Sequence, residues 1–222
     1  MAEHLLKNVD PLDAADVVRE IAGSLGIEFG EKELENIQTY GEFCEAVGIK
    51  VKGKAIEDCT TQQAFYKLRE QVGLLRGIDK ADITPASRLD DLFPRSGRRL
   101  MIRLLKDELS ISMSFLRPKD SLVFTLLLGF FASSVALFFT WRYGLAGMAF
   151  CILGFKMANY FGKEFSVTTV GEAAKEMMRL DYIKSRRNPQ TFNRKEIDTV
   201  IRNSFCHHLA LSPGVLTPDA RF

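Results

Sequence analysis

An uncharged run of twenty residues, Ser121 to Thr140, places the strongest constraint on how this chain can fold. Twelve of its residues are strongly apolar, and a helix of about twenty apolar residues crosses a bilayer core of roughly 30 Å. On insertion scales the apolar residues favour the membrane by about 4–7 kcal/mol before the cost of the small and polar positions. The alternative is a helix buried in a soluble core, but no other segment is apolar enough to surround it.

A second apolar pass, Leu145 to Phe161, follows, so the sequence predicts a transmembrane hairpin over residues 121–161. The stretch from Trp141 to Gly144 is interpreted as an interfacial turn, because Trp and Tyr favour the headgroup level and Gly breaks a helix. Lys156 either snorkels to the interface or serves in a polar contact of a transporter or lipid-processing complex. Small residues on both passes favour close packing of the two helices: Ala132, Ala136, Gly147 and Gly154.

Basic residues stand outside both ends of the hairpin, whereas the turn offers only Arg142. The positive-inside rule therefore predicts that both soluble parts and both termini are cytoplasmic, in a multi-pass protein of the cell (inner) membrane of a bacterium. The start of the chain is polar and acidic and does not predict a cleavable signal peptide. The flanking basic residues are Arg103, Lys106, Arg117, Lys119, Lys163, Lys175 and Arg179.

The soluble segments read as short amphipathic helices, because apolar residues recur every three or four positions. No segment alternates for long enough to predict a strand, so the fold class is expected to be all-α. The predicted helices span Asp13–Leu25, Gln62–Val72, Arg98–Leu109 and Asn193–Leu211.

Two pairs of short stretches resemble each other and indicate an internal repeat. Residues 37–42, Ile-Gln-Thr-Tyr-Gly-Glu, parallel residues 167–172, Val-Thr-Thr-Val-Gly-Glu, and both have the pattern of a helix capping box. Residues 83–89, Ile-Thr-Pro-Ala-Ser-Arg-Leu, parallel residues 216–222, Leu-Thr-Pro-Asp-Ala-Arg-Phe. Each member of the second pair follows an amphipathic helix.

Taken together, these stretches resemble the acyl carrier protein family, a four-helix bundle that carries phosphopantetheine on the serine of an Asp-Ser-Leu motif. That motif is present in altered form at Asp10-Pro11-Leu12-Asp13, where proline stands in place of the serine and leaves no hydroxyl to modify. Asp10 remains suited to cap a helix and Pro11 to its first position. The resemblance therefore implies a retained fold without the attachment site.

The resemblance implies two acyl-carrier-like helical bundles in addition to the two-helix transmembrane hairpin. The central module comprises residues 59–118 with 166–183, and the hairpin is inserted within it. The other module, residues 1–51 with 193–222, is a circular permutation built from both ends of the chain. It closes either within one chain or between two chains as a domain-swapped homodimer.

Ser96 occupies the position of the modified serine in the central module. Its neighbours Arg95 and Gly97 replace the Asp and Leu of the family motif, and the following helix is basic rather than acidic. A transferase that recognises an acidic carrier would be repelled by this helix, so no cofactor is expected. The alternative is phosphopantetheine on Ser96, in a membrane-tethered carrier of acyl or aminoacyl groups.

Charge is distributed unevenly along the chain. Residues 1–50 contain eleven acidic and four basic residues, whereas residues 59–120 contain twelve basic and eight acidic residues. The basic stretch could contact anionic lipid or the acidic module; nucleic acid is not expected, because aromatic interleaving and a reader fold are missing. The predicted interaction surface comprises Asp13, Asp16, Glu20, Arg95, Arg98, Arg99 and Arg103.

The sequence offers little catalytic chemistry. His207 and His208 are adjacent, and on a helix their side chains point about 100° apart, so no metal site is expected. There is no phosphate-binding glycine loop, nucleophile elbow or catalytic carboxylate pair. The four cysteines lack paired spacing and are expected to be buried free thiols. The chain is therefore predicted to be a non-enzymatic, membrane-anchored interaction or scaffold protein, whose partners are the lipid bilayer and an unidentified cytoplasmic or membrane protein.

Overall fold

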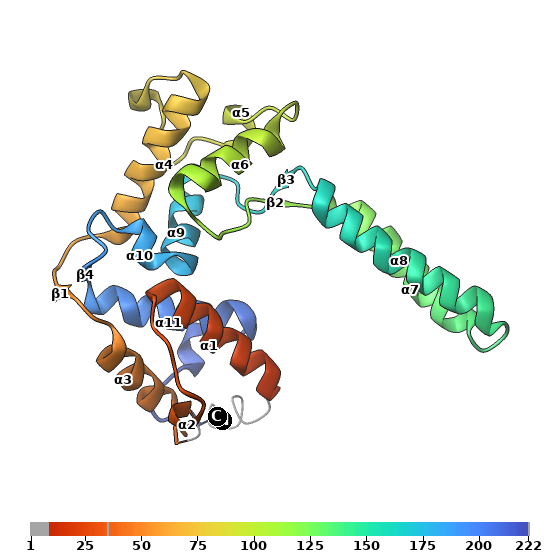
Figure 1. Ribbon diagram of the computed structural model, residues 1–222, viewed down its shortest axis with the longest axis horizontal. Helices are drawn as coiled ribbons and strands as arrows, with labels where there is room; N and C mark the ends of the chain where they lie inside the picture. Colours follow the sequence, from red (N-terminus) through yellow and green to blue (C-terminus); the bar gives the residue numbers. More distant parts are fainter. Residues whose placement is uncertain (1–8, 35, 222) are drawn as a thin grey trace. The chain divides into compact units, whose positions relative to one another are not determined.

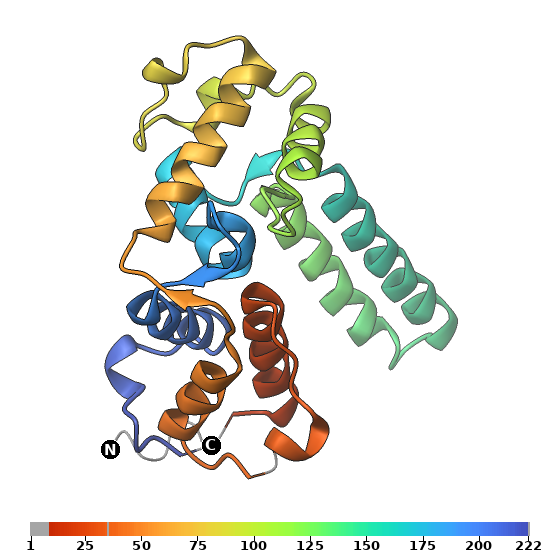
Figure 2. The same cartoon turned by 60° about the vertical axis from the view of Figure 1, so that its left-hand side comes forward.

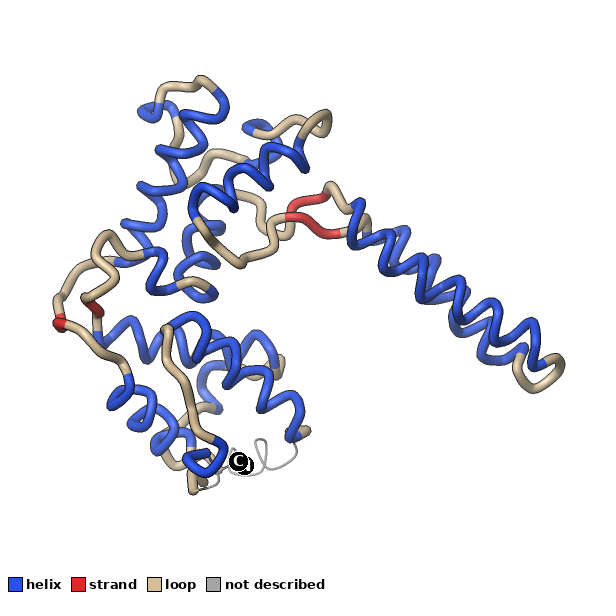
Figure 3. Tube along the Cα trace, in the orientation of Figure 1, coloured by secondary structure: helices blue, strands red, loops and turns tan. Residues whose placement is uncertain are grey.

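The computed structural model describes residues 9–34 and 36–221, and in these residues the protein is mostly helical. Figures 1 and 3 show helices joined by loops, with only two-residue strands in the described chain. This confirms the all-α prediction. The predicted helix Arg98–Leu109 coincides with α6, and the other three predicted helices differ from the observed ones only at their ends. Residues 1–8 and Phe222, at the two ends of the predicted permuted module, lie outside the described residues.

The described chain divides into two compact units. Unit 1 comprises residues up to Ser87 together with Leu105–Met113 and Val170 onward, and unit 2 comprises Arg88–Leu104 and Ser114–Thr169. Helix α6 contributes residues to both.

In unit 1, helices from the two ends of the chain pack together. Helices α1 (Pro11–Leu25) and α3 (Tyr40–Lys50) both contact α11 (Arg194–His208). The short helix α2 (Glu31–Leu34) lies between α1 and α3 in sequence. The buried core of this region includes Val17, Ile21, Leu25, Phe43, Val47, Ile197, Val200, Ile201, Phe205 and Leu216.

Unit 1 also contains α4 (Thr60–Arg76), which packs along α9 (Val170–Leu180). The short helix α10 (Tyr182–Ser185) contacts both. The two segments that connect these helices to α3 and α11 pair as parallel strands, β1 with β4, in the register Lys54–Thr191 and Ala55–Phe192. Strand pairing therefore fixes the two connections side by side. The short 3₁₀ turns η2 (Lys80–Asp82) and η3 (Pro213–Val215) follow α4 and α11.

Unit 2 is dominated by two apolar helices. Helices α7 (Asp120–Ala136) and α8 (Trp141–Phe161) lie side by side in Figures 1 and 2 and contact each other extensively. Strands β2 (Leu116–Arg117) and β3 (Glu164–Phe165) pair antiparallel at the open end of this helix pair. The unit also contains the short helix α5 (Leu89–Leu92) and the first half of α6 (Arg98–Leu109).

The prediction of a turn at Trp141–Gly144 is wrong, because α8 begins at Trp141. The connection between α7 and α8 is instead the short stretch up to Thr140, the N-cap of α8. Gly144 does not interrupt the helix but allows close packing. A Cβ at this position would lie 2.8 Å from the backbone nitrogen of Leu137. The glycine therefore lets the first turn of α8 approach the end of α7.

The start of α3 is held by the last residues of the chain. The Tyr40 amide donates to the Ala220 carbonyl at 2.8 Å, and the Gly41 amide donates to the Pro218 carbonyl at 2.9 Å. The capping box predicted at this helix is confirmed, because the Thr39 hydroxyl accepts from the Glu42 amide.

The start of α9 is held in the same way by the loop that follows α4. The Val170 amide donates to the Ser87 carbonyl at 3.0 Å, and the Gly171 amide donates to the Pro85 carbonyl at 2.9 Å. The correspondence extends to the preceding residue, because isolated bridges join position 39 to 221 and position 169 to 88. The stretches that resemble each other in sequence thus form the same backbone contact twice.

The helices that lead into these contacts also end alike. After α4, Gly77 has a φ of 63° and the Ile78 amide donates to the Gly73 carbonyl. After α11, Ala210 has a φ of 49° and the Leu211 amide donates to the Cys206 carbonyl. Both ends are Schellman-type C-caps, in which a left-handed residue closes the helix.

The glycine in each repeated contact gives a direct test of it. A Cβ at Gly41 would lie 2.8 Å from the Pro218 oxygen, and one at Gly171 would lie 2.9 Å from the Pro85 oxygen. We expect Gly41→Ala and Gly171→Ala each to lower the free energy of unfolding by about 1–3 kcal/mol, because backbone atoms must move apart. Urea denaturation followed by circular dichroism measures the effect.

Gly48, also in α3, is the matched control, because an added Cβ would meet nothing within 4 Å. Gly48→Ala is expected to raise stability by up to about 1 kcal/mol through helix propensity alone. Equal responses of all three alanine variants would show that the repeated contact is not as close as described.

Candidate membrane interface

The apolar side chains of α7 and α8 face outward. No residue of α7 is buried, and α8 buries only Gly144, Cys151 and Ala158, which recur every seven residues and therefore share one face of the helix. A core helix of a soluble protein would bury its large side chains. Here many of them are more than half exposed, including Phe124, Leu128, Phe131, Phe150 and Leu153, and so are Phe138 and Phe139 in the connection between the two helices.

One helix in the described part of the chain, α8, is both long and apolar enough to cross a membrane on its own; α7 is apolar but has seventeen residues. Glycines make the contact between the two helices close. Side chains at Gly147 and Gly154 would collide with Ser133 and Leu126, which confirms these two as packing positions. On α7 the facing glycine is Gly129, next to Cys151, whereas the predicted position Ala132 is exposed.

Lys156 lies on the exposed surface of α8, five positions before the helix ends at Phe161. At 1.5 Å per residue its Cα is about 7–8 Å from the helix end. This distance is within reach of an extended lysine side chain, so snorkelling toward that end is feasible.

Arg98 is not a surface residue, so the prediction that it belongs to an interaction surface is wrong. Its side chain is 2% exposed and donates hydrogen bonds to three acceptors within unit 2. Nε donates to the Phe93 carbonyl at 2.8 Å, Nη1 to the Lys163 carbonyl at 2.6 Å, and Nη2 to Asp90 Oδ1 at 2.7 Å. The guanidinium also lies over the Phe165 ring. Arg98 therefore fixes the start of α6 to the segment that follows α8.

The other predicted basic residues are accessible. Arg95 is exposed and forms an ion pair with Glu164, and Arg103 is exposed. Arg99 is partly buried, and its guanidinium lies 4.7 Å and 5.0 Å from the ring centroids of Tyr160 and Phe161. The basic face of α6 thus adjoins the last two residues of the apolar helix α8.

The predicted acidic surface on α1 is only partly available. Asp13 is exposed, and Asp16 is exposed and pairs with Arg19. Glu20 is mostly buried between Arg179 of α9 and His208 of α11, which corrects its prediction as a partner contact. Helix α1 does contact basic residues of its own chain, but these lie on α9 and α11 and not in the predicted basic stretch around α6.

Ser96 is exposed in the turn that precedes α6, next to Gly97, whose φ is 77°. Asp10 caps α1 as expected, because its Oδ1 accepts from the Leu12 amide at 2.8 Å. All four cysteines are free, but the prediction that they are buried holds only for Cys151, because Cys44 and Cys206 are partly exposed and Cys59 is exposed. Burial raises the pKa of the Cys44 and Cys206 thiols, which keeps them protonated and weakly reactive. No group of three or more metal-ligating side chains occurs among residues 9–34 and 36–221.

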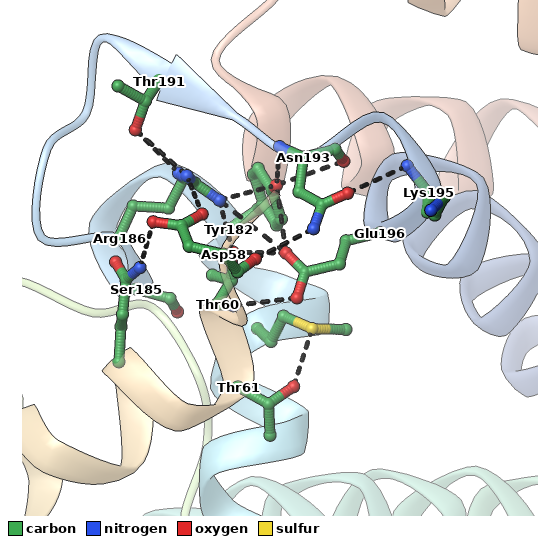
Figure 4. Close-up of polar contacts among 12 residues, drawn as sticks. Asp58, Thr60, Thr61, Tyr182, Ser185, Arg186, Thr191, Asn193, Lys195 and Glu196 are labelled. Carbon is green, nitrogen blue, oxygen red and sulfur yellow. Dashed lines mark hydrogen bonds and ion pairs between the residues drawn. The ribbon is translucent and has the colours of Figure 1, made fainter. Parts of the chain in front are cut away.

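Sequence reasoning missed a buried arginine, Arg186, which lies at the junction of the two connecting segments in unit 1 (Figure 4). Its side chain is fully buried and forms ion pairs with Asp58 and Glu196. Nη1 donates to the Thr60 hydroxyl at 2.6 Å, and Nε donates to the Thr191 hydroxyl at 3.1 Å. One side chain thus joins the start of α4, the β1–β4 pair and the start of α11.

The remaining polar groups around Arg186 are also satisfied. The Thr60 amide donates to Glu196 Oε1 at 2.8 Å, and the Tyr182 hydroxyl accepts from the Asn193 amide at 2.9 Å. Burial raises the pKa of Tyr182, so its hydroxyl stays protonated and is able to donate to Glu196. A cluster whose members are all paired is a structural clamp, with no free group directed at a ligand.

No family model, curated protein or solved structure matches this chain.

Proposed function

We propose that this protein is a non-enzymatic, membrane-anchored interaction or scaffold protein, in which α7 and α8 form a transmembrane hairpin and the helical remainder is cytoplasmic. The observation that carries the proposal is the outward-facing apolar surface of α7 and α8. A bilayer is the environment that covers such a surface on all sides. Seventeen residues, the length of α7, is the lower end of the roughly 17–25 residues that suffice for a span.

The distribution of charge supports the proposed orientation. Arg117 and Lys119 precede α7, and Lys163 follows α8, all exposed, whereas the connection between the helices is followed by Arg142 alone. Under the positive-inside rule the open end of the helix pair is cytoplasmic. Both flanks therefore lie on the same side, in a multi-pass topology of the inner membrane.

We further propose that the soluble helices form two modules that resemble acyl carrier proteins, one of them permuted. Three features support this: the contact that is repeated at α3 and α9, the matching C-caps of α4 and α11, and the packing of α11 on α1 and α3. Pro11 opens α1 and has no hydroxyl. The permuted module would then bind a partner and carry nothing, with Asp13 and Asp16 as its exposed acidic residues.

A second function, a working carrier with phosphopantetheine on Ser96, is favoured by one observation: the Ser96 hydroxyl is exposed at the start of a helix. Intact mass spectrometry of the protein from its native host distinguishes the two functions. We expect the mass of the unmodified chain, because Arg95, Arg99 and Arg103 oppose recognition by a transferase that binds acidic carriers.

Ser96→Ala is the control for that measurement. A mass increment equal to phosphopantetheine that disappears in Ser96→Ala would replace the scaffold proposal by the carrier. An increment that persists in this variant would place the modification elsewhere.

A further inference from the structure

The first half of α6 has an exposed apolar stripe that its own unit leaves uncovered. Leu100 is 60% exposed and Leu104, one turn later, is 43% exposed. The opposite face of the helix is buried through Arg98, Ile102 and Leu105. A helix that buries one apolar face and exposes a second is typical of contact with a further apolar phase.

Basic residues flank this stripe. Arg99 and Arg103 each immediately precede one of the two leucines, so guanidinium groups and leucine side chains occupy neighbouring strips of the helix surface. Arg99 contacts Tyr160 and Phe161, the last residues of α8. The stripe thus lies where the apolar surface of α8 ends, which in a membrane protein is the headgroup level.

Several contacts fix the position of α6 against α8. The buried Arg98 binds the Lys163 carbonyl, and at the surface Arg95 pairs with Glu164. The β2–β3 pair closes the same end of the helix pair through Leu116–Phe165. The exposed face of α6 is therefore held beside the end of α8.

The net charge is positive at the end of the α7–α8 pair that the β2–β3 strands close. The nearby carboxylates of Asp90, Asp120 and Glu164 are paired with Arg98, Arg117 and Arg95. Within the described residues no carboxylate forms an ion pair with five other cations of unit 2, Arg88, Arg99, Arg103, Lys119 and Lys163, whereas Asp91 is one carboxylate of the unit without an ion pair.

We propose that this face of α6 is an interfacial site for anionic phospholipid. Leu100 and Leu104 enter the boundary between headgroups and acyl chains, and Arg99 and Arg103 bind the phosphodiester groups. Guanidinium groups suit this role because they donate two parallel hydrogen bonds to phosphate. The inference rests on the proposed membrane hairpin and adds a lipid class and a third membrane contact to it.

The test uses the full-length protein in vesicles, with a fluorescent label on single cysteines in a cysteine-free background. A label at Leu100→Cys reports on the proposed interfacial site, and one at Leu128→Cys in α7 reports on the proposed membrane span. A label at Leu74→Cys in α4 is the control on an exposed leucine of unit 1. Quenchers are placed at shallow or deep positions of the lipid chain. We expect the Leu100 label to be quenched about twofold more by the shallow quencher in phosphatidylglycerol vesicles than in phosphatidylcholine alone.

The outcomes separate this inference from the function on which it rests. Deep quenching at Leu128 without quenching at Leu100 would overturn the α6 site and leave the hairpin intact; a protein partner would then be the occupant of this face. Absence of quenching at Leu128 would overturn the hairpin itself. Quenching at Leu74 equal to that at Leu100 would show non-specific adsorption and contradict the site.

The arginines are tested separately. Arg99→Gln with Arg103→Gln is expected to abolish the dependence on phosphatidylglycerol, whereas the matched pair Arg187→Gln with Arg194→Gln, both exposed in unit 1, should preserve it. If both double variants keep the full dependence, Arg99 and Arg103 do not bind the headgroups.

Discussion

Replacing Leu128 and Phe131 by arginine is expected to remove the protein from the membrane fraction. Both side chains are about 60% exposed on the outer face of α7, near the middle of that helix. In the proposed hairpin they face lipid, and two arginines there raise the free energy of insertion by about 6 kcal/mol. This approaches the whole gain from the apolar residues of the run, so alkaline extraction of membranes should release the double variant but not the native protein.

The control places arginine on an exposed leucine outside the helix pair. Leu74 of α4 is 72% exposed, and Leu74→Arg should leave both fractionation and stability unchanged. Retention of the double-arginine protein in extracted membranes would contradict the lipid-facing assignment of α7.

Arg186→Leu is expected to cost about 3 kcal/mol of unfolding free energy. The leucine replaces the apolar bulk but leaves Asp58 and Glu196 without their cation, and Glu196 is only 16% exposed. The Thr60 and Tyr182 hydroxyls also lose a donor. Urea denaturation of the purified protein in detergent measures the loss.

Two comparison variants identify the cause. The next residue, Arg187, is exposed, and Arg187→Leu should change stability by no more than about 0.5 kcal/mol. Combining Arg186→Leu with Asp58→Asn and Glu196→Gln should restore part of the loss, because the buried negative charges are removed as well. If the triple variant is no more stable than Arg186→Leu alone, unpaired charge is not the reason for the loss.

Local patterns in the sequence predicted the helices well. The apolar period in Arg98–Leu109 defines α6 because it depends only on neighbours along one helix. The same period contained an unused signal: Arg98 lies four and seven positions before the buried Ile102 and Leu105, on the same helix face. Its charge suggests the surface that its basic neighbours occupy, but its place on the helix indicates burial.

The prediction of a turn at 141–144 is wrong for a related reason. Aromatic residues and a glycine at 141–144 are typical of an interfacial turn, but they are equally compatible with the first turn of a helix. The deciding contact is the packing of Gly144 on Leu137, which depends on how two helices meet. Residue preferences alone do not carry that information.

The Arg186 clamp was outside the reach of sequence patterns. Its partners Asp58 and Thr60 are more than 120 residues away along the chain. By contrast, the similarity of residues 37–42 to 167–172, and of 83–89 to 216–222, indicates the repeated contact at α3 and α9. The same backbone hydrogen bonds and the same close glycine are needed at both places, so similar residues recur there. Long-range pairing is predictable where a repeat reveals it and not where single side chains meet.

Labelling of cysteines from one side of the membrane tests the central claim most directly. One single-cysteine variant carries Thr140→Cys in the connection between α7 and α8, and another retains the exposed native Cys59 of unit 1. In intact spheroplasts, a membrane-impermeant maleimide should modify position 140 from outside and reach Cys59 only after lysis. Modification of Cys59 in intact spheroplasts, or protection of position 140 until lysis, would contradict a hairpin that crosses the membrane with both flanks in the cytoplasm.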